Sequence, residues 1–369
     1  MRILFTRFPL ESAFGGAEVQ TLSLMKGLRD RGHEVVFLGS CPTLLSLARE
    51  NGFAAMELQI GPPPVRGDLA LSFRWRRRGM TKALRQALAD LGRFDAVCML
   101  SLTEKLLLTE ELHTASTRVL WIEHDRIGRW LRLNPYRRRL VRLARFADTI
   151  AVSALSRSLY LGLGWPADCT HAIGNGIDTD RFAVIPLPPA RVGDLQVGCI
   201  ARLTRDKGVD VLIDAVTGLA DVALTVVGAG RDEAMVRERA AAARARGTET
   251  VFLSPPIDTA AFLAERDVLV LPSRDHDPFG LVVAEAMAAG RAAIVTDACG
   301  IAGELRDGLD AIVVPAGDAE AIRQAIVRLR DEEEFRLRLS DNARQTALAR
   351  FGLVHMVDAY ERLLTAAEK

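Results

Sequence analysis

The chain has 369 residues and a net charge of +1, and 49% of its residues are hydrophobic. This length predicts two domains, and the apolar content is sufficient for a core in each. No stretch approaches about 18 uninterrupted apolar residues, and Met1-Arg-Ile-Leu-Phe5 runs directly into a strand pattern. The sequence therefore predicts neither a transmembrane helix nor a signal peptide.

The 5 cysteines and 6 histidines are scattered along the chain. An odd number of cysteines at irregular spacing predicts no disulfide framework, and neither residue type shows the paired spacing of a metal site. These patterns favour a protein of the reducing cytoplasm that binds no metal ion.

In chain order, the first half alternates short apolar runs with helical patterns. Strands are expected at residues 2–5, 34–38, 54–58, 96–100, 119–122 and 149–152. This alternation predicts a parallel sheet with crossover helices. Such sheets bind ligands beyond the carboxyl ends of their strands, so residues directly after a strand are candidates for a site.

Two such candidates lie in the first half. Phe14-Gly-Gly-Ala-Glu18 separates the first strand from a helix, and its glycine pair, Gly15 and Gly16, lets the backbone approach a ligand closely. A purely structural turn explains the pair equally well. His124 follows the strand at 119–122, where it is placed to hydrogen-bond a sugar hydroxyl, and a surface histidine at a strand end is the alternative.

Basic residues are concentrated in the first half. Residues 1–185 hold 26 Lys and Arg against 18 Asp and Glu, whereas the rest of the chain has a net charge of −7. Two stretches, Arg74–Arg78 and Arg126–Arg145, are rich in arginine, and the second contains 8 arginines and no acidic residue. Because aromatic and apolar residues are interleaved with the arginines, we expect contact with an anionic membrane. A solvated helix face is the alternative, and no nucleic-acid-binding motif accompanies the arginines.

A proline-rich stretch at 183–190 predicts a linker between a first domain at 1–185 and a second at 191–350. The second half repeats the strand and helix rhythm of the first. Its strands are expected at 196–200, 222–227, 251–253, 268–271, 292–296 and 311–314.

Arg202 and Lys207 stand between the first of these strands and the next helix. Two cations beside a helix start can clamp a diphosphate, because Arg binds two oxygens at once and Lys adds a point charge. Incidental charges on a solvated loop are the alternative. Further on, Gly228 and Gly230 match the first two glycines of the Gly-x-Gly-x-x-Gly dinucleotide-binding fingerprint. The third glycine is missing, so we interpret the pair as a turn.

The most informative stretch is Asp277-Pro-Phe-Gly-Leu-Val-Val-Ala-Glu285, which follows a strand and opens a helix. The free N–H groups of the first helical turn can receive an anion, whereas the two carboxylates suit hydroxyl groups. The residues around the turn are Phe279, Gly280, Leu281 and Val282. Phosphate and hydroxyl recognition side by side predicts a sugar-nucleotide site.

This stretch resembles the signature of retaining glycosyltransferases of the GT-B fold, sequence family 4, which reads Glu, seven residues, Glu around a Phe-Gly pair. Two positions depart from the family pattern, because Asp277 replaces the first Glu and Ala201 replaces the Gly before Arg202. The resemblance implies two Rossmann-like domains facing a central cleft, with the last helix, 353–369, packed back on the first domain.

The resemblance also implies how the site residues act. The donor is expected to be a nucleotide-diphosphate sugar, with UDP as the first choice of base and GDP as the second. Arg202 and Lys207 would hold the diphosphate, Asp277 and His124 the sugar, and Glu285 the ribose. Gly15 and Gly16 would face the phosphates and the acceptor. The two cations, Arg202 and Lys207, would take the place of a metal ion, so the expected transfer needs no metal ion and no cofactor.

The acceptor is expected on the first domain. Its basic, aromatic stretches suggest a membrane-associated acceptor, such as a lipid-linked saccharide or a lipopolysaccharide or exopolysaccharide precursor, used by an enzyme at the inner face of the cell membrane. Three alternatives stay open from the sequence. They are a UDP-sugar 2-epimerase of the same architecture, a membrane-docked sugar-nucleotide sensor without turnover, and a nicotinamide dehydrogenase.

Overall fold

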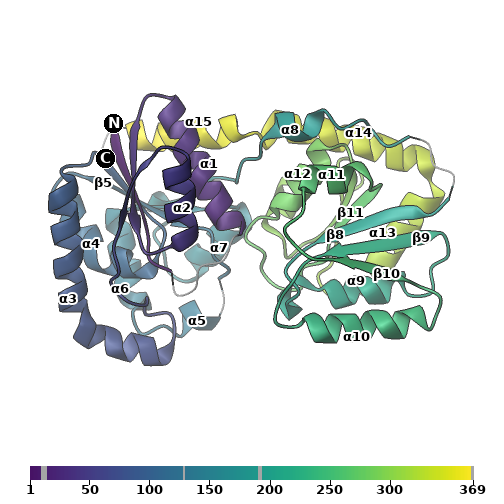
Figure 1. The fold of residues 1–369 in the computed structure, drawn as a ribbon, viewed down its shortest axis with the longest axis horizontal. Coiled ribbons are helices and arrows are strands. Elements are labelled where there is room, and N and C mark those ends of the chain that lie inside the picture. Colours follow the sequence, from purple (N-terminus) through teal and green to yellow (C-terminus); the bar gives the residue numbers. More distant parts are fainter. Residues whose placement is uncertain (10–14, 128, 190–192, 367–369) are drawn as a thin grey trace. The chain divides into compact units, whose positions relative to one another are not determined.

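The structure is a computed structural model that describes residues 1–9, 15–127, 129–189 and 193–366 (Figure 1). The chain divides into two compact units. Unit 1 comprises Met1–Gly174 and Leu353–Lys369, and unit 2 comprises Asn175–Gly352. Phe14, part of the glycine motif, lies outside the described residues.

Within its described residues, unit 1 contains a parallel sheet with the strand order β3-β2-β1-β4-β5-β6-β7. The strand order reverses between β1 and β4, which are hydrogen-bonded neighbours. The strands are β1 (Arg2–Arg7), β2 (Glu34–Gly39), β3 (Ala54–Glu57), β4 (Ala96–Met99), β5 (Arg118–Glu123), β6 (Asp148–Ala151) and β7 (Thr170–Ala172).

The central strands of unit 1 are buried on both faces because their apolar runs are nearly continuous, whereas the edge strands β3 and β7 are partly exposed. Along β1, Ile3 and Phe5 belong to one core and Leu4 to the other, as the two-residue period of a strand requires. The predicted parallel sheet is therefore confirmed.

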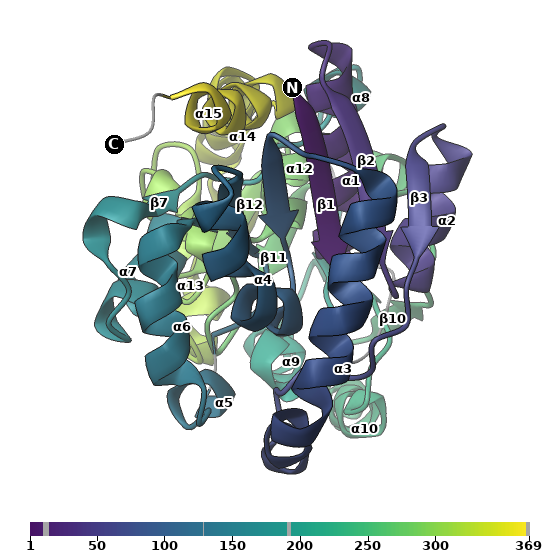
Figure 2. The ribbon, with the colours of Figure 1, turned by 90° about the vertical axis from the view of Figure 1, so that its left-hand side faces the viewer.

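Helices cover both faces of this sheet (Figure 2). The core on one face includes residues of α1, α2 and α15, and the core on the other includes residues of α3, α4 and α6. The described helices of unit 1 are α1 (Gly16–Asp30), α2 (Pro42–Glu50), α3 (Gly67–Leu91), α4 (Leu102–Thr114), α5 (Arg129–Arg132), α6 (Arg137–Leu143), η1 (Ala144–Phe146), α7 (Ala154–Gly162), η2 (Ala167–Cys169) and α15 (Leu353–Thr365).

The last helix, α15, packs against α1. A Cβ atom on Gly27 would lie 2.3 Å from a methyl group of Val357, so glycine is what lets the two helices approach. At the end of α1, the guanidinium of Arg31 forms ion pairs with Asp358 and Glu361 of α15. The contact therefore joins the two ends of the sequence within one unit.

Unit 2 contains a second parallel sheet, with the order β10-β9-β8-β11-β12-β13. Its strand order reverses between β8 and β11, which are also hydrogen-bonded neighbours. The described strands are β8 (Leu195–Ile200), β9 (Val222–Val227), β10 (Thr250–Leu253), β11 (Val268–Leu271), β12 (Ala292–Thr296) and β13 (Ile312–Val314).

Helices α9, α10 and α13 contribute to a common core with the strands of unit 2. The helices described in this unit are α8 (Thr179–Ala183), η3 (Arg205–Lys207), α9 (Val209–Val216), α10 (Glu233–Arg244), α11 (Thr259–Ala264), α12 (Leu281–Ala288), η4 (Gly300–Glu304), α13 (Ala319–Asp331) and α14 (Glu333–Arg350). Within the described ranges of both units, every helix is too short or too polar to cross a lipid bilayer.

Candidate functional site

The site residues of unit 2 lie in two loops at the point where the strand order reverses. Arg202 and Lys207 follow β8, and Asp277 follows β11. Because β8 and β11 are neighbouring parallel strands, both loops leave the same edge of the sheet. Open α/β sheets bind ligands at this reversal point.

A buried ion pair connects the two loops. The Lys207 ammonium donates to the Asp277 carboxylate at 2.6 Å, and the Ser273 hydroxyl donates to the same oxygen at 3.0 Å. The exposed fractions of the two charged side chains are only 15% and 9%. The acidic and basic residues that were expected to bind different parts of a donor therefore also orient one another.

Glycines bring the backbones of these loops together. A Cβ atom on Gly208 would lie 2.0 Å from the carbonyl oxygen of Pro272, and Gly208 has a φ of +65°. On the other side, Cβ atoms on Gly228 and Gly230 would lie 2.0 and 2.4 Å from the carbonyl oxygens of Ala201 and Leu203. In the structure, Gly228 and Gly230 thus support the loop that carries Arg202.

The Arg202 side chain is exposed, and in the described part of the chain its guanidinium forms no ion pair. The two cations of this loop therefore differ. Lys207 is held by Asp277, whereas Arg202 is available to an anion from outside.

The loop before α12 is held by backbone hydrogen bonds to the segment after β12. The Asp277 N–H donates to the carbonyl of Ala298 at 2.9 Å, and the Asp277 carbonyl accepts from Gly300 at 2.8 Å. The Phe279 side chain is buried and packs edge-on against Phe351, with ring centroids 6.3 Å apart. Phe279 thus anchors the loop through its side chain.

Gly280 caps α12 with a φ of 100°, a left-handed conformation that favours glycine. The next residues, Leu281 and Val282, begin the helix, so their N–H groups lack partners within it. One turn further, burial raises the pKa of Glu285 to about 7, and the charge of Arg181 opposes this shift. Among the described residues, no hydrogen-bond partner holds the Glu285 carboxylate.

In unit 1, the glycine pair lies at the start of α1. Gly15 has an extended backbone with a φ of −154°, and Gly16 is the first helical residue. Among the described residues, a Cβ atom on Gly15 would meet only the Glu18 carboxylate, at 3.4 Å. Neither backbone strain nor protein packing therefore demands glycine at position 15.

Glu18 forms a buried ion pair with Arg7, which ends β1, at 2.7 Å. His124, directly after β5, is half-buried. Burial, together with the nearby charges of Arg7 and Lys105, lowers the pKa of His124 to about 3. The imidazole is therefore neutral at physiological pH and can both donate and accept a hydrogen bond.

Lys105 is positioned by the start of α4. The Ser101 N–H donates to Glu104 at 2.7 Å, and together the two side chains form a capping box. Lys105, the next residue, donates to Glu123 at the end of β5 at 2.9 Å, and both side chains are largely buried. Arg7 and Lys105 at this sheet edge are thus each held in an ion pair.

The structure gathers the predicted residues into two groups. Unit 2 holds Arg202, Lys207, Asp277, Phe279, Gly280, Leu281, Val282 and Glu285, and unit 1 holds Gly15, Gly16 and His124. Sequence reasoning missed Arg7, Glu18, Lys105 and Glu123 as site residues. The Ser-x-x-Glu pattern of the capping box was a usable signal for the start of α4, but no sequence signal pairs Arg7 with Glu18 or Lys105 with Glu123.

Across the parts of the chain that are described, no three His, Cys, Asp or Glu side chains lie close enough together to hold a metal ion.

Comparisons with known proteins agree with this architecture. Residues 14–181 match the family model described as Glycosyltransferase Family 4, and residues 188–346 match the one described as Glycosyl transferases group 1. The lipopolysaccharide core biosynthesis glycosyltransferase LpsE of Rhizobium meliloti (strain 1021) is 32% identical over 208 residues, which are 55% of this chain and 60% of LpsE. The phosphatidyl-myo-inositol mannosyltransferase of Mycobacterium leprae (strain TN) is 29% identical over 342 residues, which are 88% of this chain and 86% of that protein.

Among solved structures, Anabaena Alr3699/HepE in complex with UDP is similar over 100% of both chains, with a TM-score of 0.83 at 20% identity. The boundary between the two family models lies near the junction of the two units. Each half of the chain therefore matches a glycosyltransferase family model. The resemblance of the Asp277–Glu285 stretch to GT-B glycosyltransferases is thereby confirmed. The chain belongs to the group 1 glycosyltransferases, and its two Rossmann-like units are those of the GT-B fold.

Proposed function

We propose that this glycosyltransferase transfers a sugar from a nucleotide-diphosphate sugar, with retention of the anomeric configuration and without a metal ion. The observation that carries the proposal is the loop edge of unit 2, where an unpaired Arg202, the Lys207–Asp277 pair and the start of α12 meet. A diphosphate leaving group gathers negative charge as the glycosidic bond breaks. Fixed donors aimed at that charge are usually the largest catalytic contribution.

Each residue has a distinct role in this proposal. Arg202 and Lys207 bind the diphosphate in place of a metal ion, together with the N–H groups at Leu281 and Val282. Asp277 holds hydroxyls of the donor sugar, and Glu285 holds the ribose hydroxyls. Since no described residue partners the Glu285 carboxylate, a ligand hydroxyl would supply a partner.

The unit 1 residues act on the sugar side. A neutral His124 hydrogen-bonds a hydroxyl of the donor sugar, consistent with its depressed pKa. The glycine pair at Gly15 and Gly16 leaves room for the donor phosphates and the acceptor, since a side chain at position 15 would meet little protein. Retention of configuration rests on the family resemblance.

We propose UDP as the nucleotide, because the similar Anabaena structure contains UDP, with GDP as the second choice. We propose a lipid-linked saccharide or a lipopolysaccharide precursor as the acceptor. The names of two relatives, a lipopolysaccharide core glycosyltransferase and a phosphatidyl-myo-inositol mannosyltransferase, support an acceptor of this class.

A membrane acceptor fits the surface of unit 1. Helix α3 exposes Leu71 and Trp75, whose exposed fractions are 72% and 80%, and Leu133 in the second arginine-rich stretch is 74% exposed. Arg77 and Arg78 of α3 line a groove together with Arg139 of α6. Exposed apolar residues among arginines are typical of a peripheral membrane surface, here at the inner face of the membrane.

Thermal-shift measurements against UDP-, GDP-, ADP- and dTDP-sugars, with and without EDTA, test the donor site. A ligand at about 100 times its dissociation constant stabilises the folded state by about 2.7 kcal/mol. We expect a shift with sugars of one base that is unchanged by EDTA. If no nucleotide sugar shifts the melting of a folded sample, the transferase proposal fails in favour of a protein without a donor site. If EDTA abolishes the melting shift, the donor site stands and only the proposal of metal independence fails.

A further inference from the structure

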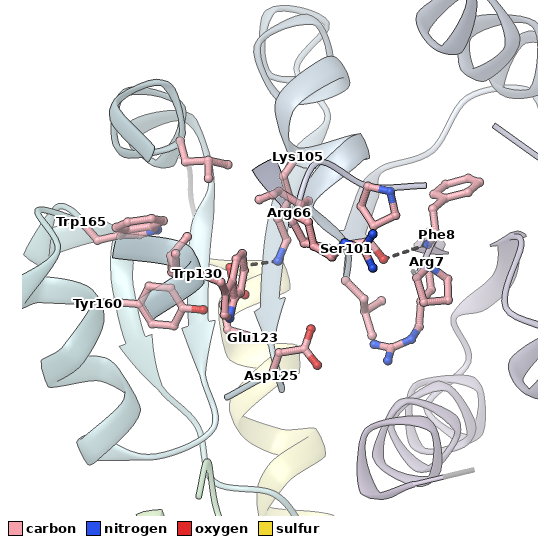
Figure 3. Close-up of a pocket in the computed structure, with 17 residues that line it drawn as sticks. Arg7, Phe8, Arg66, Ser101, Lys105, Glu123, Asp125, Trp130, Tyr160 and Trp165 are labelled. Carbon is pink, nitrogen blue, oxygen red and sulfur yellow. Dashed lines mark hydrogen bonds and ion pairs between the residues drawn. The ribbon is translucent and has the colours of Figure 1, made fainter. Parts of the chain in front are cut away.

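Unit 1 has a cavity of about 420 Å³ at the reversal point of its own sheet (Figure 3). Arg7, Phe8 and Pro9, which end or follow β1, line one side, and Ser101 and neighbouring residues after β4 line another. Since β1 and β4 are the strands between which the order reverses, the cavity lies where open α/β sheets bind ligands. Its volume lies within the usual range of small-molecule sites.

Aromatic side chains form a large part of the lining. Trp130, Tyr160 and Trp165 all border the cavity. Tyr160 and Trp165 are buried and pack edge-on, with ring centroids 5.1 Å apart. The Trp130 indole N–H donates to the Arg126 carbonyl at 3.2 Å, which fixes the orientation of this half-buried ring. The cavity therefore offers rigid aromatic surfaces.

The three basic side chains of the lining each pair with an acidic side chain, and the partner of Arg66 is Asp68, at 3.1 Å. Lys105 pairs with Glu123 at 2.9 Å, and Arg7 pairs with Glu18 at 2.7 Å. Burial raises the pKa of the Tyr160 hydroxyl, and the negative charge of Glu123 adds to this shift. Figure 3 shows the Asp125 carboxylate between the Arg7 side and the Tyr160 side of the cavity.

This lining disfavours a strongly charged ligand of either sign. An anion such as a phosphate would meet the carboxylates of Glu123 and Asp125, and a cation would meet the basic side chains of Arg7, Arg66 and Lys105. A sugar ring fits both properties of the cavity. Its C–H faces pack on aromatic rings, and its hydroxyls act as donors to carboxylates and acceptors from Lys and Arg.

We propose that this cavity binds a neutral sugar ring of the acceptor. The ring packs against Trp130, and one of its hydroxyls donates a hydrogen bond to the Asp125 carboxylate. The inference rests on the proposed function and assigns the acceptor to a subsite of defined chemistry: an uncharged saccharide unit. Anionic groups of the same acceptor, phosphates included, are excluded from the cavity and lie elsewhere.

The test is a titration of the full chain with methyl glycosides of glucose, galactose and mannose, followed by saturation-transfer NMR, with glucose 6-phosphate as the charged counterpart. We expect saturable binding of at least one neutral glycoside and weaker binding of the phosphate. Trp130→Ala and Asp125→Asn should each weaken that binding about tenfold. The control is Leu348→Ala, which removes an exposed apolar side chain of α14 in unit 2 and should change nothing.

Three outcomes overturn the inference: no neutral glycoside binds, glucose 6-phosphate binds more tightly than every neutral glycoside, or Trp130→Ala binds like the wild type. Melting shifts with nucleotide sugars, measured on the same samples, separate this failure from that of the transferase proposal. A retained donor shift in Trp130→Ala shows that the variant is folded and that its donor site is intact. If the wild-type protein binds glycosides at Trp130 but shows no melting shift with nucleotide sugars, the cavity proposal stands and the transferase proposal fails.

Discussion

At the residue scale, the charges at both sheet edges divide into those that have a partner and those that do not. Lys207 with Asp277, Arg7 with Glu18 and Lys105 with Glu123 are largely buried pairs. A buried pair fixes the geometry of both members, because losing one leaves an uncompensated charge. Arg202 and Glu285 have no such partner among the residues that the structure describes, so a ligand would supply the missing contact of each.

Glu285 should make donor affinity depend on pH. Its pKa of about 7 means that the ionised fraction rises nearly tenfold between pH 6 and pH 8. Since ribose hydroxyls donate to the ionised carboxylate, the affinity for a UDP-sugar should rise about tenfold over this interval. Calorimetric titrations at both pH values measure it. Glu285→Gln should bind weakly at both, and a wild-type affinity that falls with rising pH contradicts the assignment.

The same pKa has a consequence for stability in the absence of donor. The folded state holds the Glu285 proton more tightly than the unfolded state, whose carboxyl has the ordinary value of 4.5. The free energy of unfolding should therefore fall as the pH rises from about 4.5 to about 7, by at most about 3 kcal/mol. Urea unfolding of Glu285→Gln should show a smaller loss than the wild type over this window, and equal losses would assign the effect to other groups.

Removing Lys207 should cost stability as well as activity. Lys207→Ala leaves the Asp277 carboxylate buried with only the Ser273 hydroxyl as a side-chain partner, at a cost of about 3 kcal/mol or more. Urea denaturation measures this. In the double variant with Asp277→Asn, most of the stability should return while activity does not. A Lys207→Ala protein as stable as the wild type would mean that the pair does not hold the loops together.

At the scale of elements, the site of unit 2 depends on how closely its loops pass one another. Gly208 has a left-handed backbone conformation, and a Cβ atom added to it would lie 2.0 Å from the carbonyl oxygen of Pro272. Gly218 has a similar φ of 75° but nothing within 4 Å of that position. Gly208→Ala should therefore destabilise by at least about 2 kcal/mol more than Gly218→Ala and should weaken donor binding. Equal effects of the two substitutions, measured by urea denaturation, would show that the close approach is unimportant.

Much of this arrangement was predictable from the sequence. Apolar runs of strand length alternate with helical patterns, and these runs predicted twelve of the strands that the structure describes. The exception is β7, whose three residues, Thr170 to Ala172, contain no apolar run. The Asp277–Glu285 stretch and Arg202 were recognisable because the chemistry is local in sequence. The pairs Arg7–Glu18 and Lys105–Glu123 were not, because each joins two elements that only the folded sheet brings together.

At the scale of the whole molecule, the excess of positive charge in the first half is a property of one unit. Its exposed arginines lie beside exposed apolar residues on α3 and around α6. Reversing Arg74, Arg78 and Arg138 to Glu should weaken binding to anionic vesicles by at least about a hundredfold, since each basic residue near such a surface contributes about 1 kcal/mol. Co-sedimentation measures this loss.

The matched control for the vesicle experiment reverses Arg231, Arg244 and Arg246, which are exposed residues of unit 2. The same change in net charge there should leave most of the binding intact. Equal losses in the two triple variants would mean that net charge alone draws the protein to the membrane, and an unchanged affinity after reversal in unit 1 would remove the membrane proposal.

The central claim is that the loop edge of unit 2 binds the diphosphate of a sugar donor. Calorimetric titration of Arg202→Ala with the nucleotide sugar that stabilises the wild type tests this most directly, with Arg246→Ala as the control. Because Arg202 is exposed and has no ion pair in the described structure, its removal should leave the melting temperature of the free protein unchanged. The account predicts donor affinity at least about tenfold weaker in Arg202→Ala and unchanged in Arg246→Ala. Wild-type affinity in Arg202→Ala would contradict it.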